Sequence, residues 1–392
     1  MVKTAGQPKR WVIAGGGTGG HVTPALALGE ALHRDGDEVL FVGSARGLES
    51  KLVPDAGFDL VMLPSEQVMG RNLFGRIRGA FSILRSAWMA RGVLKKFQAD
   101  AVISVGGYAA MPAALAARLS GRPLFLLEPN AIPGRVNRLT ARFARTVFVG
   151  FESTRGALPT KTESICVGVP LRRALYRAFG DRTEKDVPSA PLRLFVFGGS
   201  QGARQLNEQV PEALSRLRPK SVEVFHQTGE VDRAMVEARY AELGLPAEVV
   251  AFEHEMPKRY EWADLAICRS GALTVAELAI AGMPALLVPY PFAADNHQAA
   301  NASALEEAGA ARCLDGRPLD VHLLAQAVAE LVTTPGRLVL MREAAERLAR
   351  PHAAADLIEH CRARLEGRPP NIDHAARTKP QTATATNEED AP

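Results

Sequence analysis

Short apolar runs recur along the chain and alternate with segments in which apolar residues return every three or four positions. A short apolar run bounded by glycine or polar residues predicts a strand buried on both faces. Alternation of such runs with helical segments predicts the βαβ units of a parallel sheet. The predicted strands cover residues 11–14, 39–42, 101–105, 124–127, 146–149, 192–197, 222–227, 248–252, 265–268 and 285–288.

These strands divide into two similar halves, which predicts an α/β protein with two Rossmann-like, doubly wound domains facing a central cleft. The length of 392 residues also favours two domains. The charged, Pro-rich segment 180–191 lies between the halves, and the crossing could equally lie near Pro170. We predict a first domain over 1–170 and a second over 171–344. A helix at about 345–366 would pack back onto the first domain, and residues 367–392 are too polar to order.

Three glycine-rich runs each follow a predicted strand and lead into a predicted helix. They are GGGTGGH at 15–21, GGYAAMP at 106–112 and GGSQGAR at 198–204. Glycine lets the backbone approach a ligand, and the start of the following helix attracts phosphate. Because both halves carry such runs, we expect a nucleotide in the cleft between the domains.

The first run also matches the GxGxxG pattern of dinucleotide-binding enzymes through Gly15, Gly17 and Gly20. That function is disfavoured, because the strand at 39–42 is followed by Gly43 and Ser44 instead of a ribose-binding acid. His21 starts the first helix, where a neutral imidazole could accept a proton from a hydroxyl. A structural role in capping or packing on the loop is the alternative.

The run CRSGALTVAE at 268–277 could hold a diphosphate, with Glu277 accepting from a ribose hydroxyl. Alternatively, Thr274 caps the helix and Glu277 completes a capping box. The polar set that follows the loop at 289–291 is typical of sugar recognition: Asp295, Asn296, His297, Gln298 and Asn301.

Neither the acids nor the cysteines predict a metal site. Asp35 and Asp37 form a DGD between a helix and a strand, which indicates turn chemistry. The four cysteines are scattered without metal-ligand or disulfide spacing. With no apolar run of bilayer-spanning length and no signal peptide, we expect a cytoplasmic protein.

Positive charge is concentrated in one segment. Residues 67–150 contain thirteen Lys and Arg against two acids, whereas the whole chain carries only +4. An apolar helical stripe with flanking arginines lies here, which suits either a lipid surface or the protein's own core. The apolar residues are Leu73, Ile77, Phe81, Leu84 and Trp88, and the arginines are Arg71, Arg76, Arg78 and Arg85.

In combination and order, these motifs resemble the MurG family of bacterial glycosyltransferases over nearly all residues to about Leu365. The matching runs are GGGTGGHVTPALAL, SVGGYAAMPAALAA, GGSQGARQLN and CRSGALTVAELAIAGMPALLVP. The resemblance implies a glycosyltransferase B-type fold and inverting transfer of N-acetylglucosamine (GlcNAc) from UDP-GlcNAc to undecaprenyl-diphosphate-linked MurNAc-pentapeptide, in peptidoglycan synthesis. It implies no cofactor, metal or nucleic-acid partner, and a peripheral location on the cytoplasmic face of the inner membrane, with the basic stripe on anionic lipid.

The resemblance also assigns site residues. His21 is the candidate general base for the acceptor's C4 hydroxyl, and Glu277 the ribose ligand. The loop at 289–298 is one residue longer than in many members, so Gln298 is preferred over His297 as a donor ligand. Where the family reads HEQN, this chain keeps Glu128 and Asn130 only. The implied substrate-binding set is Thr18, Gly19, Gly20, Asn130, Arg172, Ser200, Glu253, Ala272, Leu273, Thr274, Val275, Ala276, Glu277 and Gln298.

Other enzymes of this architecture are the alternatives, namely a diacylglycerol glycosyltransferase or a UDP-GlcNAc epimerase, since fold alone does not separate them. A nucleotide-sugar-binding regulator without turnover is a third. The GGSQGAR run and the ALTVAE helix favour the MurG family, and His21 favours an enzyme over a binder.

Overall fold

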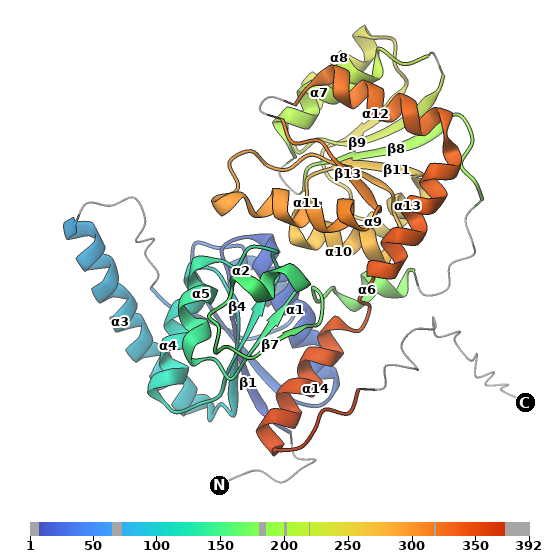
Figure 1. Ribbon diagram of the computed structural model, residues 1–392. Coiled ribbons are helices and arrows are strands. Elements are labelled where there is room, and N and C mark those ends of the chain that lie inside the picture. The colour runs from blue at the N-terminus through green and yellow to red at the C-terminus, as the bar shows by residue number, and fades with distance from the viewer. Residues whose placement is uncertain are drawn as a thin grey trace, which may run out of the picture.

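Two domains, each built on one parallel sheet, lie one above the other in the computed structural model (Figure 1). The structure describes residues 8–64, 73–179, 186–199, 202–218, 220–316 and 319–372. The prediction of two doubly wound α/β domains is confirmed.

The first domain contains a seven-stranded sheet in the order β3-β2-β1-β4-β5-β6-β7, with every pairing parallel. The order reverses between β1 and β4, which places a crevice at their carboxyl ends. The strands are β1 (Arg10–Gly15), β2 (Glu38–Gly43), β3 (Leu60–Met62), β4 (Ala101–Gly106), β5 (Leu124–Glu128), β6 (Thr146–Val149) and β7 (Ser164–Cys166). The helices are α1 (Gly19–Arg34), α2 (Glu49–Asp55), α3 (Leu73–Phe97), α4 (Met111–Leu119) and α5 (Arg135–Thr140).

Both faces of this sheet are covered, so its central strands are apolar throughout. On β1, Trp11 and Ile13 pack with α1, and Val12 and Ala14 pack with α3 and α4. All four side chains are fully buried. Burial of successive residues on opposite faces explains why this strand reads as an unbroken apolar run.

The second domain repeats the design with a six-stranded parallel sheet in the order β10-β9-β8-β11-β12-β13. Leu194 and Val196 of β8 face α7 and α12, whereas Phe195 and Phe197 face α9 and α10. The strands are β8 (Leu192–Phe197), β9 (Val222–Gln227), β10 (Ala247–Val250), β11 (Leu265–Cys268), β12 (Ala285–Leu287) and β13 (Ala311–Cys313). The helices are α7 (Arg204–Leu214), α8 (Arg233–Glu242), α9 (Met256–Trp262), α10 (Ala272–Ile280), α11 (His297–Glu307), α12 (Val321–Thr333) and α13 (Pro335–Leu348).

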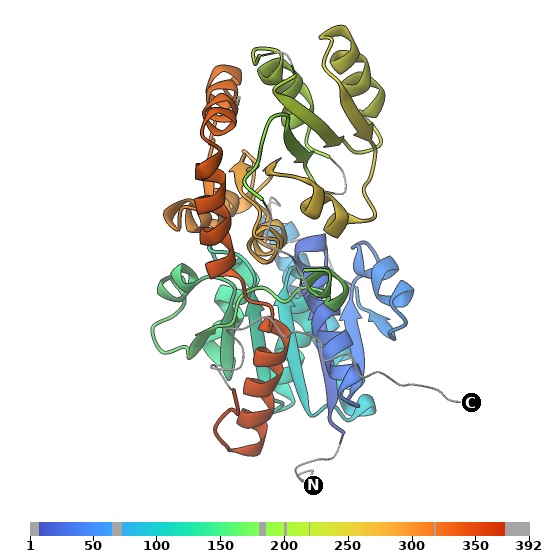
Figure 2. The ribbon, with the colours of Figure 1, turned by 90° about the vertical axis from the view of Figure 1, so that its right-hand side faces the viewer.

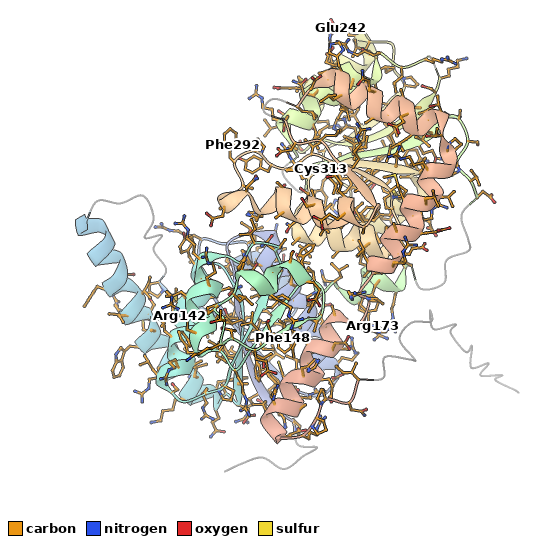
Figure 3. The ribbon with its side chains drawn as sticks, in the orientation of Figure 1. Arg142, Phe148, Arg173, Glu242, Phe292 and Cys313 are labelled. Atoms are coloured by element: carbon orange, nitrogen blue, oxygen red, sulfur yellow. The ribbon has the colours of Figure 1, made fainter. Side chains whose placement is uncertain are left out.

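The chain crosses between the domains twice. It leaves the first domain before α6 (Arg173–Arg177) and returns between α13 and α14 (Ala353–Glu366), as the orange-to-red segment in Figure 2 shows. The expected helix at about 345–366 is therefore two helices, since α13 ends at Leu348 and α14 begins at Ala353. Leu357 of α14 belongs to the same buried core cluster of the first domain as Phe148, which Figure 3 labels.

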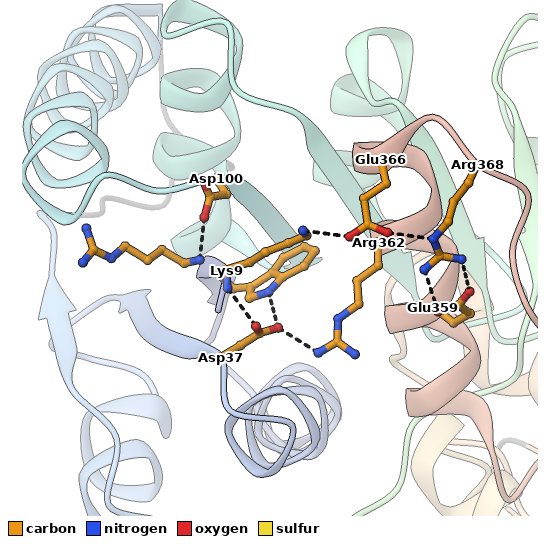
Figure 4. Close-up of polar contacts among 9 residues, drawn as sticks. Lys9, Asp37, Asp100, Glu359, Arg362, Glu366 and Arg368 are labelled. Carbon is orange, nitrogen blue, oxygen red and sulfur yellow. Dashed lines mark hydrogen bonds and ion pairs between the residues drawn. The ribbon is translucent and has the colours of Figure 1, made fainter. Parts of the chain in front are cut away.

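Ion pairs fasten α14 to the first domain (Figure 4). The Arg362 guanidinium lies 2.9 Å from Asp35 and 2.8 Å from Asp37, and the Lys9 ammonium lies 2.8 Å from Glu366. Asp37 also accepts from the Trp11 indole N–H at 2.8 Å and from the Lys9 backbone N–H at 2.8 Å. Asp35 and Asp37, the two acids of the DGD turn, thus hold α14 against the first domain.

The first residues of the expected disordered tail are held in place. Gly367 ends α14 with a left-handed φ of 70°, and Arg368 pairs with Glu359 at 2.6 Å. The Asn371 N–H donates to Glu359 at 2.7 Å. The remainder of the predicted tail, from residue 373, lies outside the described residues.

Within the described ranges, no single helix is long and apolar enough to cross a bilayer. Residues Val321–Thr333 and Pro335–Glu366 meet that criterion only as a pair bent by 98°.

Replacing Asp37 with Ala should lower the free energy of unfolding by about 3 kcal/mol, because the substitution strands a buried indole N–H and a backbone N–H and removes a partner of Arg362. Asp35→Ala is the matched control, since the more exposed Asp35 shares Arg362 and its loss should cost less than about 1 kcal/mol. Urea unfolding measures both. Equal losses in the two variants would contradict the importance given to the buried contacts of Asp37.

Candidate active site

The N-termini of two helices, one from each domain, have no side-chain cap within the described residues and lie at the domain boundary. Thr18 precedes α1 and Gly271 precedes α10; among the described residues no side chain caps either helix, and neither first turn contains an acid. Helix α1 contacts α10 across the boundary. The partial positive charge of both helix starts is therefore available to an anionic ligand.

The first two glycine runs pack directly on each other. They follow the neighbouring strands β1 and β4, and Gly107 has a φ of 80°. A Cβ atom on Gly107 would lie 2.4 Å from the Gly16 carbonyl oxygen, so no other residue fits. This close approach forms one continuous rim of backbone at the carboxyl edge of the first sheet.

His21 lies in the first turn of α1 and faces the second domain. Its Nδ1 lies 3.3 Å from the Thr18 hydroxyl oxygen. Burial lowers the pKa of His21 to about 4; His297 at the start of α11 acts in the same direction, and Glu49 in the opposite one. The imidazole is thus neutral at pH 7 and has a lone pair with which to accept a proton.

Glu128 organises the turn after β5. Its carboxylate, almost fully buried, accepts from the Asn130 N–H at 3.0 Å, the Gly134 N–H at 2.8 Å and the Asn137 side-chain amide at 2.9 Å. Burial raises the pKa of Glu128, although the three donors favour its ionised form. Leu127 and Pro129 stand where the family has His and Gln. The hydrogen bonds that Glu128 makes within the turn are nevertheless present.

Asn301 of α11 joins the two domains. Its Oδ1 accepts from the Ala131 N–H at 2.8 Å, and its Nδ2 donates to the Asn130 side chain at 3.3 Å and to the Ser270 carbonyl at 3.1 Å. The side chain is fully buried. Asn130, predicted as a ligand, is therefore tied to the loop before α10.

Glu277 is not part of a capping box. Gly271 is the N-cap of α10, Thr274 makes no cap hydrogen bond, and the half-buried Glu277 instead accepts from the Tyr260 hydroxyl at 2.9 Å. Burial raises the pKa of Glu277 to about 7, against the Tyr260 hydrogen bond, which lowers it. A carboxylate in this position can accept from a pair of ligand hydroxyls.

Gln298 lies beside this helix start. Its backbone carbonyl accepts from the Ser270 hydroxyl at 2.8 Å, and its side-chain oxygen accepts from the Tyr290 N–H at 2.9 Å. The His297 Nδ1 donates to the Ala294 carbonyl at 2.7 Å. Both candidate donor ligands therefore lie at the start of α11. Of the two, His297 acts electrostatically on His21 and lowers its pKa.

One predicted ligand, Arg172, is held away from these helix starts by an ion pair. Arg172 pairs with Glu30 at 2.6 Å, nine residues and hence about 14 Å along α1 from His21. The Glu253 carboxylate accepts from Arg259 at 2.6 Å, and the predicted ligand contact, through the backbone near Glu253, does not involve that carboxylate. Ser200 lies outside the described residues.

Two supporting side chains escaped the sequence analysis. Arg269 donates to Gln205 at 2.9 Å and to the carbonyls of Val288 and Pro289 at 3.0 and 2.9 Å. Glu49 binds the first glycine loop. For Arg269 the available signal was a single charge inside an otherwise small or apolar run, whereas Glu49 stands between Arg46 and Lys51 and carries no such signal. In the described part of the chain, no three His, Cys, Asp or Glu side chains gather as a metal site.

The described part of the apolar stripe on α3 is exposed instead of packed. Phe81, Leu84 and Trp88 are 71%, 57% and 67% exposed, whereas Ala87 and Leu94 on the opposite face are buried against the domain. The alternative prediction, that the stripe packs on the protein's own core, is therefore wrong for these three residues. Arg71 and the side chains of Leu73, Arg76, Ile77 and Arg78 lie outside the described residues.

Comparison with known proteins identifies the family. The description "Glycosyltransferase family 28 N-terminal domain" matches residues 11–149, and "Glycosyltransferase family 28 C-terminal domain" matches 193–359. The chain is 43% identical over 354 residues to the UDP-N-acetylglucosamine–N-acetylmuramyl-(pentapeptide) pyrophosphoryl-undecaprenol N-acetylglucosamine transferase of Alkalilimnicola ehrlichii, covering 89% of this chain and 97% of that protein. The chain belongs to the MurG family of glycosyltransferases.

Other relatives agree. The transferase of the same description from Geobacter metallireducens is 39% identical, with 89% and 97% of the two chains covered. The crystal structure of Acinetobacter baumannii MurG superposes with a TM-score of 0.77 at 32% identity, covering 91% of this chain and 99% of that one. The expected MurG resemblance and glycosyltransferase B-type fold are confirmed. A UDP-N-acetylglucosamine 2-epimerase of Listeria monocytogenes, at 14% identity and a TM-score of 0.64, shares the fold alone.

Proposed function

We propose that this protein transfers GlcNAc from UDP-GlcNAc to the C4 hydroxyl of undecaprenyl-diphosphate-linked MurNAc-pentapeptide, with inversion and with His21 as general base. The printed activity of the MurG relatives supports the substrates. The observation that carries the mechanism is the position of His21 in the first turn of α1, a helix that contacts α10 across the domain boundary, where burial lowers the pKa of the imidazole.

The chemistry is a single displacement. The acceptor oxygen forms a bond to the anomeric carbon of GlcNAc while the bond from that carbon to the diphosphate breaks, and UDP leaves. The acceptor's proton passes to His21. With the ring proton on Nδ1 donating to Thr18, Nε2 holds the lone pair that takes it.

The second domain holds the donor in this proposal. The start of α10 stabilises the charge that develops on the leaving diphosphate. Glu277 accepts from the ribose hydroxyls and Gln298 binds the sugar. The backbone that surrounds the diphosphate and ribose belongs to Ala272, Leu273, Thr274, Val275 and Ala276, with Ser200 and the backbone of Glu253 at the nucleoside.

The first domain holds the acceptor. Thr18, Gly19 and Gly20 border its diphosphate at the open start of α1. Asn130, supported by Glu128 and Asn301, lies at the junction of the two substrates. Arg172 completes this set only if it leaves Glu30, since its guanidinium is paired in the present structure.

The exposed face of α3 completes the proposal as a membrane contact. Phe81, Leu84 and Trp88 would enter the interface of an anionic leaflet, where the lipid acceptor lies, and Arg85 would reach lipid phosphates. The Arg91 guanidinium lies 5.4 Å from the centre of the Trp88 ring, which keeps a second positive charge on this face. The enzyme thus works as a peripheral protein of the inner membrane's cytoplasmic face.

His21→Ala should lower the turnover of GlcNAc transfer about 100-fold or more, the usual size of general-base catalysis, and leave UDP affinity within a few-fold. Labelled UDP-GlcNAc with a lipid-linked MurNAc-pentapeptide measures turnover, and calorimetry measures UDP binding. His33→Ala, at the other end of α1, is the control and should behave as the wild type. Wild-type turnover in His21→Ala would remove this residue from the mechanism, and absence of acceptor-dependent transfer by the wild type would refute the activity.

Replacing Phe81, Leu84 and Trp88 together with Ser should weaken binding to phosphatidylglycerol vesicles about 10-fold or more, because the apolar area that enters the lipid interface is removed. Transfer to a detergent-dispersed acceptor should stay within about 2-fold of the wild type. Leu340→Ser, at an exposed leucine of α13, serves as the control. Unchanged vesicle binding in the triple variant would contradict the membrane contact.

A further inference from the structure

Glu49 is a buried charge packed against the glycine-rich loop that follows β1. It is the first residue of α2, and only 1% of it is exposed. One carboxylate oxygen accepts from the Gly17 N–H at 2.8 Å. The other accepts from the Ser44 N–H at 2.9 Å and the Ser44 hydroxyl at 2.7 Å. Three donors converge on this group, which fits an ionised, acceptor-only carboxylate.

Three glycines leave room for this side chain. A Cβ atom on Gly16, Gly43 or Gly47 would lie 2.3, 2.5 or 2.0 Å from side-chain atoms of Glu49. None of these three glycines has a positive φ, so backbone conformation does not require glycine there. They come from the loop after β1, the end of β2 and the segment before α2, and together they form a cage whose shape matches the carboxylate.

The Glu49 carboxylate is linked to His21 through a short stretch of backbone. Gly17, with a φ of 93°, donates its N–H to Glu49, and the next residue, Thr18, precedes α1 and contacts the His21 ring. The Gly17 carbonyl accepts from the Leu48 N–H at 3.4 Å, so both polar groups of Gly17 are held by the segment that leads into α2. The Gly17 N–H is therefore taken by Glu49 and is not offered to the acceptor's diphosphate.

We propose that Glu49 is a positioning residue for the proton transfer, because its caged carboxylate fixes the first glycine loop and places a negative charge near the imidazolium that forms on His21. The proposal rests on His21 being the base. The direction in which Glu49 shifts the pKa of His21 is consistent with it, since a nearby carboxylate stabilises the protonated ring.

The test compares Glu49→Gln, His21→Ala and their double variant in GlcNAc transfer, with UDP binding measured alongside. Glu49→Gln should lower kcat about 10-fold or more, while KM for UDP-GlcNAc and UDP affinity stay within about 2-fold, because the donor lies on the other domain. The double variant should be no slower than His21→Ala alone, because Glu49 acts through that residue. Glu49→Asp, which keeps the charge, should recover part of the loss.

The cage gives an independent test. Gly47→Ala places a methyl group where the carboxylate lies and should lower kcat as far as Glu49→Ala does, whereas Gly47→Ala combined with Glu49→Ala should be no slower than Glu49→Ala alone. Gly336→Ala is the matched control, because a Cβ there meets open space.

Wild-type kcat in Glu49→Gln, with activity lost in His21→Ala, would overturn this proposal alone. So would a parallel fall of kcat, UDP affinity and melting temperature in Glu49→Gln, which would indicate a general structural role. Full activity of His21→Ala would overturn the assignment of the base, and this proposal with it.

Discussion

Buried side chains that satisfy several backbone groups at once hold the loops after the strands in shape. Loops at the carboxyl edge of a parallel sheet have backbone N–H and carbonyl groups that are not paired with a neighbouring strand. A buried group of this kind destabilises the fold unless it makes a hydrogen bond. Glu49 and Glu128 serve these groups in the first domain, and Arg269 serves them in the second. These groups are satisfied from within the protein, whereas no described side chain caps the start of α1 or of α10.

The two domains meet through polar contacts that belong to the site itself. Asn301 ties the turn after β5 to the loop before α10, and Asp295 lies 3.7 Å from Arg135 across the same boundary. His297 contributes to the low pKa of His21 from the opposite domain. The pKa of the proposed base therefore depends in part on a residue of the opposite domain.

The sequence predicted the central strands and the glycine loops, because strands buried on both faces read as unbroken apolar runs and each loop stands between a strand and a helix. The three-residue edge strands β3, β7 and β13 escaped it, since three residues carry no periodicity. The partner of Glu277, Tyr260, lies 17 residues earlier in the chain, so only the fold separates a ligand role from a capping box. The cage around Glu49 joins three separate segments and has no local pattern.

The role proposed for His21 requires that burial at the domain boundary keep its imidazole neutral and ready to accept a proton. An NMR titration of the ¹⁵N-labelled His21 side chain in the intact protein, assigned with His21→Ala, tests this most directly. The buried ring is expected to stay neutral as the pH falls through 6.5 and to titrate only at a pKa of about 4. A midpoint at or above 6.5 would contradict it, because the ring would then be solvated and partly protonated where the enzyme works.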